Sequence, residues 1–396
     1  MKWEIKKLAD CCVSITDGDH QPPPKAQKGI PFVTISNITT ANQFDFSNTM
    51  YVSEEYYNHL DSKRKPQRGD ILYSVVGSFG IPVYIKETIP FVFQRHIAVL
   101  RPNHTILPQF LYYTMLNRDF YLMADAAAIG AAQRTVSLSA LRNMKIAVPP
   151  INIQEKIVYL LSAYDNLIEN NQKQIKLLEE AAQRLYKEWF VDLRFPGYET
   201  TPVVDGVPEG WESTTLENIC ALNKQVLAQT DIPPNIPYIG LEHMPRKDIC
   251  LCEWGTSSEV LSSKFLYQEK DIIFGKIRPY FHKVGFALNS GIASTDSIIM
   301  RANEGVWGLL LMTVSSVAFV DYVSKTCKEG SKMPRADWNQ MKAYPILIPD
   351  EGTREKFEVN IGLITDRIKA LALQNRGLAE ARDRLLPKLM SGELEV

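Results

Sequence analysis

Apolar and polar residues follow one another along the segment from Asn152 to Phe190 in the pattern of a long amphipathic helix. Apolar side chains recur every seven residues in one row, and a second apolar row lies one step further round the same face. Asn171 interrupts the first row. The rows are Ile157, Tyr164, Leu178 and Leu185, and Leu161, Ile168, Ile175, Ala182 and Trp189. The pattern predicts a helix with a coiled-coil face.

A second segment, from Gly352 to Met390, repeats this helix. Glu355-Lys356 repeats Glu155-Lys156 at an offset of 355 − 155 = 200, and the two segments align without a gap. The apolar row of the second helix is Phe357, Ile364, Leu371, Leu378 and Leu385. At a rise of ~1.5 Å per residue, about 39 helical residues would reach nearly 60 Å.

The segments before the two helices are also related. The matching stretches are "WEIKKLADCC" with "WESTTLENIC", "IPFVTISNI" with "IPYIGLEHM", "RGDILYS" with "EKDIIFG", and "MKIAVPP" with "YPILIPD". The third pair aligns Asp70 with Asp271. The predicted order is a globular domain (1–150), a helix (151–195), a Pro/Gly-rich linker with a second globular domain (196–350), and a second helix (351–396). Two repeats of this size are domains, so a solenoid is excluded.

Each globular domain is expected to be α+β, with strands prevailing. Short β-rich runs such as "DILYSVV" and "FVFQRHIAVLR" (91–101) are separated by Gly, Pro and Asn. Each domain also contains one apolar segment that predicts a helix, over 107–125 in the first and over 306–324 in the second.

The order of the elements suggests how the two helices pair. The first helix leads away from the first domain, and the second helix follows the second domain. If their apolar stripes pair, an antiparallel coiled coil carries two similar domains related by an approximate two-fold axis. Because B-DNA turns once in ~34 Å, readers held on a fixed spacer would contact two half-sites at a fixed separation. The domains differ in sequence, so the half-sites should differ too.

Composition changes this picture little. Of 396 residues, 45% are hydrophobic and 22% are charged, which is typical of a globular protein. Lys+Arg number 44 and Asp+Glu 45, so the net charge of −1 argues neither for nor against nucleic acid. No apolar run is long enough to span a bilayer and no secretory signal is evident, so a cytoplasmic location is the default expectation.

The six cysteines fit neither paired zinc knuckles nor a disulfide framework. We interpret them as reduced, small apolar residues. A zinc site formed by His243, Cys250 and Cys252 stays open as the less favoured alternative.

Three stretches of the chain resemble the specificity subunit of type I restriction–modification systems. They are "LSALRNMKIAVPPINIQEKI", "AAQRLYKEWFVDLRFPG" and "LAEARDRLLPKLMSGELEV", and they occur in this order within the duplicated plan. The second copy of the first stretch departs slightly, with Asp350 and Arg354 in place of Pro150 and Gln154. The resemblance extends over essentially the whole chain.

This resemblance implies two target-recognition domains, each reading one half of a split, asymmetric double-stranded DNA sequence. The helices would set the spacing and dock two methyltransferase subunits that bind S-adenosylmethionine and methylate adenine. Restriction subunits that use ATP and Mg²⁺ would join them. This chain itself is then expected to bind no cofactor and to catalyse nothing.

The residues agree with an absence of catalysis. The chain has no glycine-rich dinucleotide loop or Walker loop, and Gly77 and Gly80 in "VVGSFGIP" are too few for either motif. An enzyme hypothesis, such as a fused methyltransferase or a nuclease, leaves no room for a catalytic domain. A third hypothesis, a scaffold that joins two protein partners without touching DNA, is not rejected by composition.

The candidate DNA contacts are polar residues in loops between predicted strands, because base edges and phosphates are bound by side-chain donors and acceptors. In the first domain they are Lys63, Arg64 and Lys65 as phosphate contacts, and Ser78, Gln94, Arg95, His96, Gln133 and Arg134. In the second domain they are Lys276, Arg278, Tyr280, Lys283, Ser294, Thr295, Ser331, Lys332 and Arg335, with Asp296 beside them.

These assignments have structural alternatives. Gln94 or His96 within a strand could instead satisfy a buried backbone group, and Lys63 to Lys65 could form a solvated loop. Arg134 and Arg335 are favoured, since both copies place a basic residue after a small-residue turn, and Gly130 and Gly330 share the 200-residue offset.

The apolar cluster of Tyr186, Trp189 and Phe190 at the end of the first helix is too large to be left in water. It could seat the helix on a recognition domain, or it could form part of the methyltransferase dock. The sequence does not decide between the two.

Overall fold

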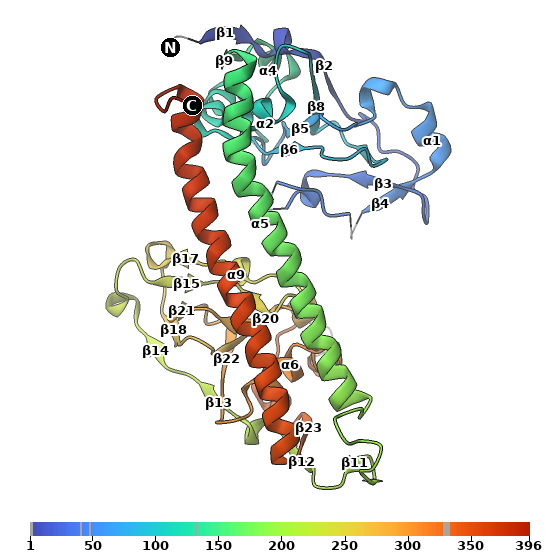
Figure 1. Cartoon of the computed structure of the whole chain (residues 1–396), viewed down its shortest axis with the longest axis vertical. Helices are drawn as coiled ribbons and strands as arrows, with labels where there is room; N and C mark the ends of the chain where they lie inside the picture. The colour runs from blue at the N-terminus through green and yellow to red at the C-terminus, as the bar shows by residue number, and fades with distance from the viewer. Residues whose placement is uncertain (1–2, 40–41, 47–48, 132, 328–332) are drawn as a thin grey trace. The chain divides into compact units, whose positions relative to one another are not determined.

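The computed structural model describes residues 3–39, 42–46, 49–131, 133–327 and 333–396. The chain divides into two compact units: unit 1 comprises Met1–Asn166 and Leu378–Val396, and unit 2 comprises Leu167–Gly377. Two long helices, α5 (Ile151–Tyr186) and α9 (Glu351–Ser391), each contribute to both units (Figure 1).

Unit 1 contains an antiparallel sheet in the order β2-β8-β5-β6 and a smaller sheet in the order β4-β3-β7, in which β3 and β7 are parallel. The strands of the two sheets are β2 (Cys12–Asp17), β3 (Ile30–Val33), β4 (Met50–Val52), β5 (Ile71–Ser74), β6 (Pro82–Tyr84), β7 (Val92–Phe93) and β8 (Ile97–Pro102). β1 (Glu4–Lys7) pairs with β9 (Lys145–Val148), which leads directly into α5. The helices are α1 (Glu54–His59), α2 (Pro108–Leu116), α3 (Arg118–Ala127) and α4 (Leu138–Asn143), with short 3₁₀ turns η1 (Leu8–Cys11), η2 (Ile35–Asn37) and η3 (Ser62–Arg64).

Unit 2 contains two five-stranded sheets, in the orders β13-β22-β19-β20-β16 and β14-β18-β21-β15-β17. Their strands are β13 (Cys220–Asn223), β14 (Val226–Leu227), β15 (Pro237–Ile239), β16 (Cys250–Leu251), β17 (Gly255–Thr256), β18 (Lys264–Tyr267), β19 (Ile272–Gly275), β20 (Val284–Ala287), β21 (Gly291–Ala293) and β22 (Ser297–Ala302). β12 (Glu212–Thr215) pairs with β23 (Pro345–Ile348), which leads into α9, and β10 (Val203–Val204) pairs with β11 (Val207–Pro208). The helices are α6 (Trp307–Val314), α7 (Val317–Lys325) and α8 (Trp338–Met341).

The repeat in the sequence is a repeat in the structure. β5, β8 and β2 of unit 1 correspond to β19, β22 and β13 of unit 2. Asp70 and Asp271 are both buried, and each accepts two hydrogen bonds from one arginine. The distances from Arg101 to Asp70 are 3.0 and 2.8 Å, and those from Arg301 to Asp271 are 2.8 and 2.7 Å. The alignment of these two aspartates is confirmed, and it identifies a bidentate buried ion pair in each unit.

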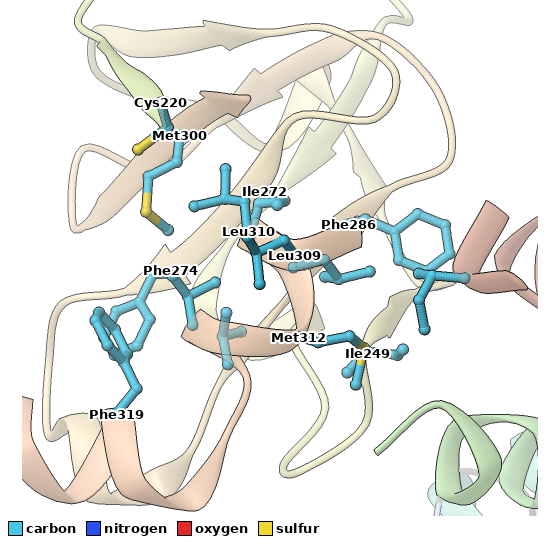
Figure 2. Close-up of a cluster of buried hydrophobic side chains, with 14 of the residues drawn as sticks. Cys220, Ile249, Ile272, Phe274, Phe286, Met300, Leu309, Leu310, Met312 and Phe319 are labelled. Carbon is cyan, nitrogen blue, oxygen red and sulfur yellow. The ribbon is translucent and has the colours of Figure 1, made fainter. Parts of the chain in front are cut away.

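Each unit has its own apolar core. In unit 2, Ile272 and Phe274 of β19 face Leu309, Leu310 and other side chains of α6 and α7 (Figure 2). In unit 1, Tyr73 of β5 packs edge-on against Phe120 of α3, with ring centroids 5.7 Å apart. Each fully buried Leu, Ile or Phe stabilises such a core by about 1.5–3 kcal/mol.

The two long helices pack against each other within each unit. In unit 1, Arg382 of α9 and Tyr113 of α2 both donate hydrogen bonds to Asp165 of α5, at 2.7 Å each. In unit 2, buried Asn171 of α5 donates to Gln374 and Asn375 of α9, at 2.9 Å each, and Trp189 lies against Phe357. Residues with higher numbers in α5 contact residues with lower numbers in α9, so the two helices are antiparallel within unit 2.

Three predicted elements are wrong in detail. The single helices expected over 107–125 and 306–324 are each two helices. In unit 1, Asn117 adopts an extended conformation between α2 and α3 (φ −64°, ψ 138°). In unit 2, the Ser316 hydroxyl caps α7 by accepting from the Phe319 amide, and the helices bend by 58°. The strand expected over 91–101 is divided by a turn at Gln94–His96 that carries the chain from one sheet to the other.

Among the described residues, no single helix is long and apolar enough to cross a membrane. α6 and α7 reach the required length and composition only as a bent pair. Leu309, Leu310 and Phe319 of this pair are buried in the core of unit 2, which accounts for their apolar character.

Candidate nucleic-acid interface

Three loops of unit 1 are joined by backbone hydrogen bonds into one edge. The Val75 amide donates to the His96 carbonyl (2.8 Å), the Val136 amide donates to the Val75 carbonyl (2.9 Å), and the Gly77 amide donates to the Arg134 carbonyl (3.0 Å). We call residues 75–78, 94–96 and 133–136 the loop edge of unit 1. It brings together six of the predicted contacts: Ser78, Gln94, Arg95, His96, Gln133 and Arg134.

The side chains of this edge are largely accessible. Ser78, Arg95, Gln133 and Arg134 are exposed, while Gln94 and His96 are half-buried in a turn rather than within a strand. Burial is the main cause that lowers the pKa of His96, with a smaller contribution from the positive charge of Arg95. His96 is therefore held towards its neutral form, in which one ring nitrogen donates and the other accepts.

Arg134 is held by its neighbours. Its guanidinium pairs with Asp125 at the end of α3 and lies over the Phe79 ring, 5.5 Å from the centroid. Gly130 just before it has φ +102°, and a Cβ there would lie 2.6 Å from the Gln133 carbonyl oxygen. Only glycine fits this turn, so the small-residue loop has a steric cause.

The basic residues Lys63, Arg64 and Lys65 lie on and after η3, beside an acidic loop that the sequence analysis did not single out. Arg64 lies 3.9 Å from Asp17 and 3.6 Å from Asp19. The same loop holds His20, 2.9 Å from Asp17, and Tyr56 donates to Asp19 at 2.8 Å. Only glycine fits at position 18 of this loop, because a Cβ on Gly18 would lie 2.0 Å from the Phe93 carbonyl oxygen.

The three basic side chains therefore differ in what they can offer. Arg64 is partly neutralised by Asp17 and Asp19, and Lys65 donates to the Asn58 carbonyl at 3.0 Å. Lys63 is exposed, and its carbonyl accepts a hydrogen bond from Thr16. Of the three, Lys63 is the best placed to contact a phosphate from this surface.

Unit 2 has the same edge, built by the same hydrogen bonds. The Lys276 amide donates to the Asp296 carbonyl (2.8 Å), the Ala336 amide donates to the Lys276 carbonyl (2.9 Å), and the Arg278 amide donates to the Pro334 carbonyl (2.8 Å). We call residues 276–278, 294–296 and 334–336 the loop edge of unit 2. It brings together Lys276, Arg278, Ser294, Thr295 and Arg335 with Asp296, whereas Ser331 and Lys332 lie outside the described residues.

The two favoured arginines do not occupy equivalent positions. Arg335 forms a β-bridge with Ile277, as Thr135 does with Val76, so Arg335 corresponds to Thr135. By the backbone hydrogen bonds given above, Arg134 corresponds to Pro334. In extended backbone, neighbouring residues point to opposite faces. This one-residue difference explains why Arg134 pairs with Asp125 while Arg335 pairs with Asp296, at 3.3 Å.

The remaining candidates of unit 2 divide into bound and exposed side chains. Lys276 donates to the Thr295 carbonyl at 2.8 Å, and burial lowers its pKa against the opposing effect of Asp296. Lys283 is bound to the Leu241 carbonyl, and burial lowers its pKa as well. Arg278 and Tyr280 are exposed. The nearby Phe281 ring also carries Arg246, 4.2 Å from its centroid, a residue that the sequence analysis missed.

A groove of about 840 Å³ borders the loop edge of unit 2. Lys276 and Arg335 line it, together with Lys224, Phe265 and Trp338, which the sequence analysis also missed. Phe265 lies in β18 and Trp338 in α8, whereas Lys224, Lys276 and Arg335 lie in the loops after β13, after β19 and before α8. No local sequence pattern could group them.

The apolar cluster at the end of α5 lies in the core of unit 2. Trp189 is 8% exposed, and the Phe190 ring centroid lies 4.7 Å from that of Phe357 and 5.5 Å from that of Trp211. Burial raises the pKa of Tyr186 to about 12. The structure thus favours the interpretation in which Tyr186, Trp189 and Phe190 seat the helix on a globular domain. Trp189 is buried and the other two side chains are half-buried against the same core, which leaves little surface for a partner.

The zinc alternative has no support from the geometry. The Gly240 amide donates to His243 Nδ1 at 3.0 Å, which closes a local turn. Among the described residues, no group of three or more His, Cys, Asp or Glu side chains is placed to hold a metal ion.

Comparison with known proteins gives consistent matches. Residues 1–180 match the type I restriction modification DNA specificity domain. The chain is 24% identical to the type I restriction enzyme MjaIX specificity subunit of Methanocaldococcus jannaschii, over 100% of this chain and 94% of that protein. It is 20% identical to the HindI specificity subunit of Haemophilus influenzae, over 92% of this chain and 95% of that protein.

A solved structure shares the fold. The type I restriction–modification S subunit from M. genitalium is 14% identical, with a TM-score of 0.57 over 98% of this chain and 96% of that one. The domain match over residues 1–180, the relatives that span the whole chain and the duplicated architecture together make this chain similar along its length to type I restriction–modification specificity subunits.

Proposed function

We propose that this chain supplies the DNA-sequence specificity of a type I restriction–modification complex, with each unit reading one half of a bipartite, asymmetric site. One observation carries the proposal: the two loop edges share their backbone hydrogen bonds but present different side chains. Gln94, Arg95 and His96 in unit 1 stand where unit 2 has Ser294, Thr295 and Asp296. A common backbone with exchanged donors and acceptors is what two unlike half-sites require.

We further propose that α5 and α9 set the spacing and carry the methyltransferase subunits. Tyr159 of α5 and Val359 of α9 are repeat-equivalent, and they are 76% and 61% exposed. Exposed apolar side chains on a helix mark surfaces that a partner can cover. Because each unit has one such position, we expect two copies of the same partner to bind, one at each position.

In this proposal the chain provides recognition and the partner subunits provide the chemistry. S-adenosylmethionine is expected on the methyltransferase subunits, and ATP and Mg²⁺ are expected on the restriction subunits. The complex would act on double-stranded DNA in the cytoplasm, and this chain would be non-catalytic.

A scaffold that bridges two protein partners without reading DNA is the alternative, and it is not favoured. It would use the helices and leave the two loop edges without a role.

The test is selection of bound sequences from randomised duplexes by the purified complex of this chain with its methyltransferase. We expect an enriched motif with two unlike halves separated by a fixed gap. A swap of residues 94–96 for the sequence of 294–296 should change only one half of the motif. Enrichment of no motif would support the scaffold instead.

A further inference from the structure

The groove beside the loop edge of unit 2 has the composition of a ligand site. Its lining combines aromatic rings with three cations, Lys224, Lys276 and Arg335, and one carboxylate, Asp337. Its volume of about 840 Å³ lies in the ~300–1,000 Å³ range of pockets that bury small organic molecules. The site is therefore positively charged and large enough for a nucleotide.

A buried hydroxyl in the lining lacks a partner. Ser297 lines the groove, is 1% exposed, and its Oγ forms no hydrogen bond with the described residues. Nearly all buried hydroxyls in proteins are hydrogen-bonded, so an exception needs a cause. The corresponding first residue of β8 in unit 1 is Ile97, which shows that this position of the fold does not need a polar side chain. The polar side chain of Ser297 is therefore not required by the fold. Its Oγ is covered by the lining and would reach a ligand only after a small rearrangement.

The aromatic residues of the lining are only half-buried. The Lys276 ammonium lies 5.3 Å from the centroid of the Phe265 ring, and Trp338 stands at the start of α8, just beyond Arg335. Rings beside cations are the combination on which proteins hold unstacked bases, because the ring stacks on the base and the cation binds the phosphate. Stacked bases inside a duplex cannot enter such a groove.

We propose that this groove binds one nucleotide of the half-site read by unit 2, unstacked from its neighbours. Trp338 stacks on the base, the Ser297 hydroxyl forms a hydrogen bond with the base once the lining rearranges, and Lys224 holds an adjoining phosphate. This inference rests on the proposed function, since it names the part of the DNA that the site takes.

Photo-crosslinking with the methyltransferase complex tests this assignment. After selection has defined the cognate duplex, one base at a time in the unit 2 half-site is replaced by a photoreactive halogenated base, on both strands. We expect one position to crosslink to Trp338 or Phe265, as mapped by mass spectrometry. If sequence-selective binding is intact and no position reaches a residue of the groove, the inference is overturned while the proposed function stands. Loss of all sequence selectivity in the wild type would instead overturn the proposed function.

Two substitutions give an independent measurement. Trp338→Ala should weaken cognate binding about tenfold, because base–aromatic stacking is worth ~1–3 kcal/mol. Trp338→Phe should keep most of the affinity, because it retains an aromatic ring. This variant still tests the stacking if the alanine variant does not fold. Trp254→Ala truncates another half-buried tryptophan of unit 2 that does not line the groove, and should bind as the wild type does.

Ser297→Ala separates ligand binding from packing. If the hydroxyl bonds a base, cognate affinity falls about fivefold. If the hydroxyl is only an unsatisfied core atom, the variant gains stability and keeps its affinity, which contradicts the inference. Saturable binding of a free mononucleotide that Trp338→Ala abolishes, without any crosslink from the duplex, would also overturn it, because the ligand would then not be DNA.

Discussion

At the residue scale, Arg335 is the side chain best placed to read a base in unit 2. It is exposed, belongs to the loop edge and is paired with Asp296 at 3.3 Å, a partner that DNA could replace. A bidentate arginine–guanine contact discriminates by ~1–3 kcal/mol. Arg335→Ala in the methyltransferase complex should therefore weaken binding to the cognate duplex by about 5–150-fold, and binding to a scrambled duplex far less.

Arg335→Lys is the matched control for this prediction. Lysine keeps the charge but cannot form the planar two-bond contact. It should restore non-specific binding and leave cognate binding weakened. Equal losses on the two duplexes for Arg335→Ala would show that Arg335 contacts phosphate only.

The buried ion pairs give a second prediction at this scale. Asp70→Asn and Asp271→Asn each leave an arginine without its carboxylate, and breaking a buried pair costs about 3–5 kcal/mol. The Arg101 side chain is 18% exposed and that of Arg301 is 44% exposed. Water can therefore solvate Arg301 better, and the loss should be larger in unit 1. Hydrogen exchange of the β5 and β19 amides measures the stability of each unit separately. An equal or larger loss of protection at β19 would contradict this prediction.

Residue positions within loops were the least predictable from the sequence. The pairing of Asp70 with Asp271 follows from strands that align without a gap. Arg134 and Arg335 looked equivalent because each follows a small-residue turn, yet the bridge register separates them by one residue. Such a register is decided by backbone hydrogen bonds to residues about 60 positions away, which a local pattern does not contain.

At the element scale, Glu179 connects α5 to the sheet of unit 2. Its carboxylate is buried and accepts from the Ile249 and Cys250 amides, at 2.9 and 3.1 Å. Burial, and then the charge of Asp248, raise the pKa of Glu179 from 4.5 to about 7. Asp248, beside Lys176, also has a pKa raised by burial.

The stability of unit 2 should consequently depend on pH. A folded-state pKa above the unfolded one gives stability that is fully present below pH ~4.5 and is lost as the pH rises through ~7, by up to about 3 kcal/mol. Glu179→Gln keeps an acceptor oxygen and removes this titration. The free energy of unfolding of unit 2 should therefore vary less between pH 5 and 8 in this variant than in the wild type. Hydrogen exchange of β16 measures the effect.

The neighbouring Glu180→Gln is the control, because the Glu180 side chain is 45% exposed and its carboxylate lies 3.9 Å from the Arg184 guanidinium. It should leave the pH dependence of the wild type unchanged. If Glu179→Gln and wild type lose stability in parallel as the pH rises, other groups carry the dependence.

Elements with one strong period were predictable, and elements interrupted by tertiary structure were not. The heptad rows fix α5 and α9, since no other conformation places their apolar residues on one face. The segments 107–125 and 306–324 are apolar throughout, so their pattern does not reveal where a bend falls. Ser316 carries a usable signal, because serine before an apolar run caps a helix. Asn117, whose side chain makes no capping hydrogen bond, carries none.

At the scale of the whole molecule, duplication explains why two loop edges with the same backbone hydrogen bonds occur in one chain. The pairs β1–β9 and β12–β23 each join the start of a globular domain to the strand that enters a long helix. Each globular domain is therefore tied to its own helix by one pair of strands. The candidate contacts could be predicted as a class from polar loops, whereas the groove at Trp338 could not, because it forms only when distant strands meet.

The duplication also predicts the stoichiometry of the complex. If Tyr159 and Val359 mark two equivalent docking surfaces, Tyr159→Glu or Val359→Glu alone should leave one methyltransferase subunit bound. The double variant should leave none. The reason is that an unpaired charge buried in an interface costs several kcal/mol. Native mass spectrometry of the co-expressed subunits counts them. Leu177 of α5 is similarly exposed at 64%, but its repeat partner is Gly377, so it belongs to no duplicated apolar position. Leu177→Glu should therefore retain both subunits, and a complex that keeps two methyltransferases in the double variant would place the docking surfaces elsewhere.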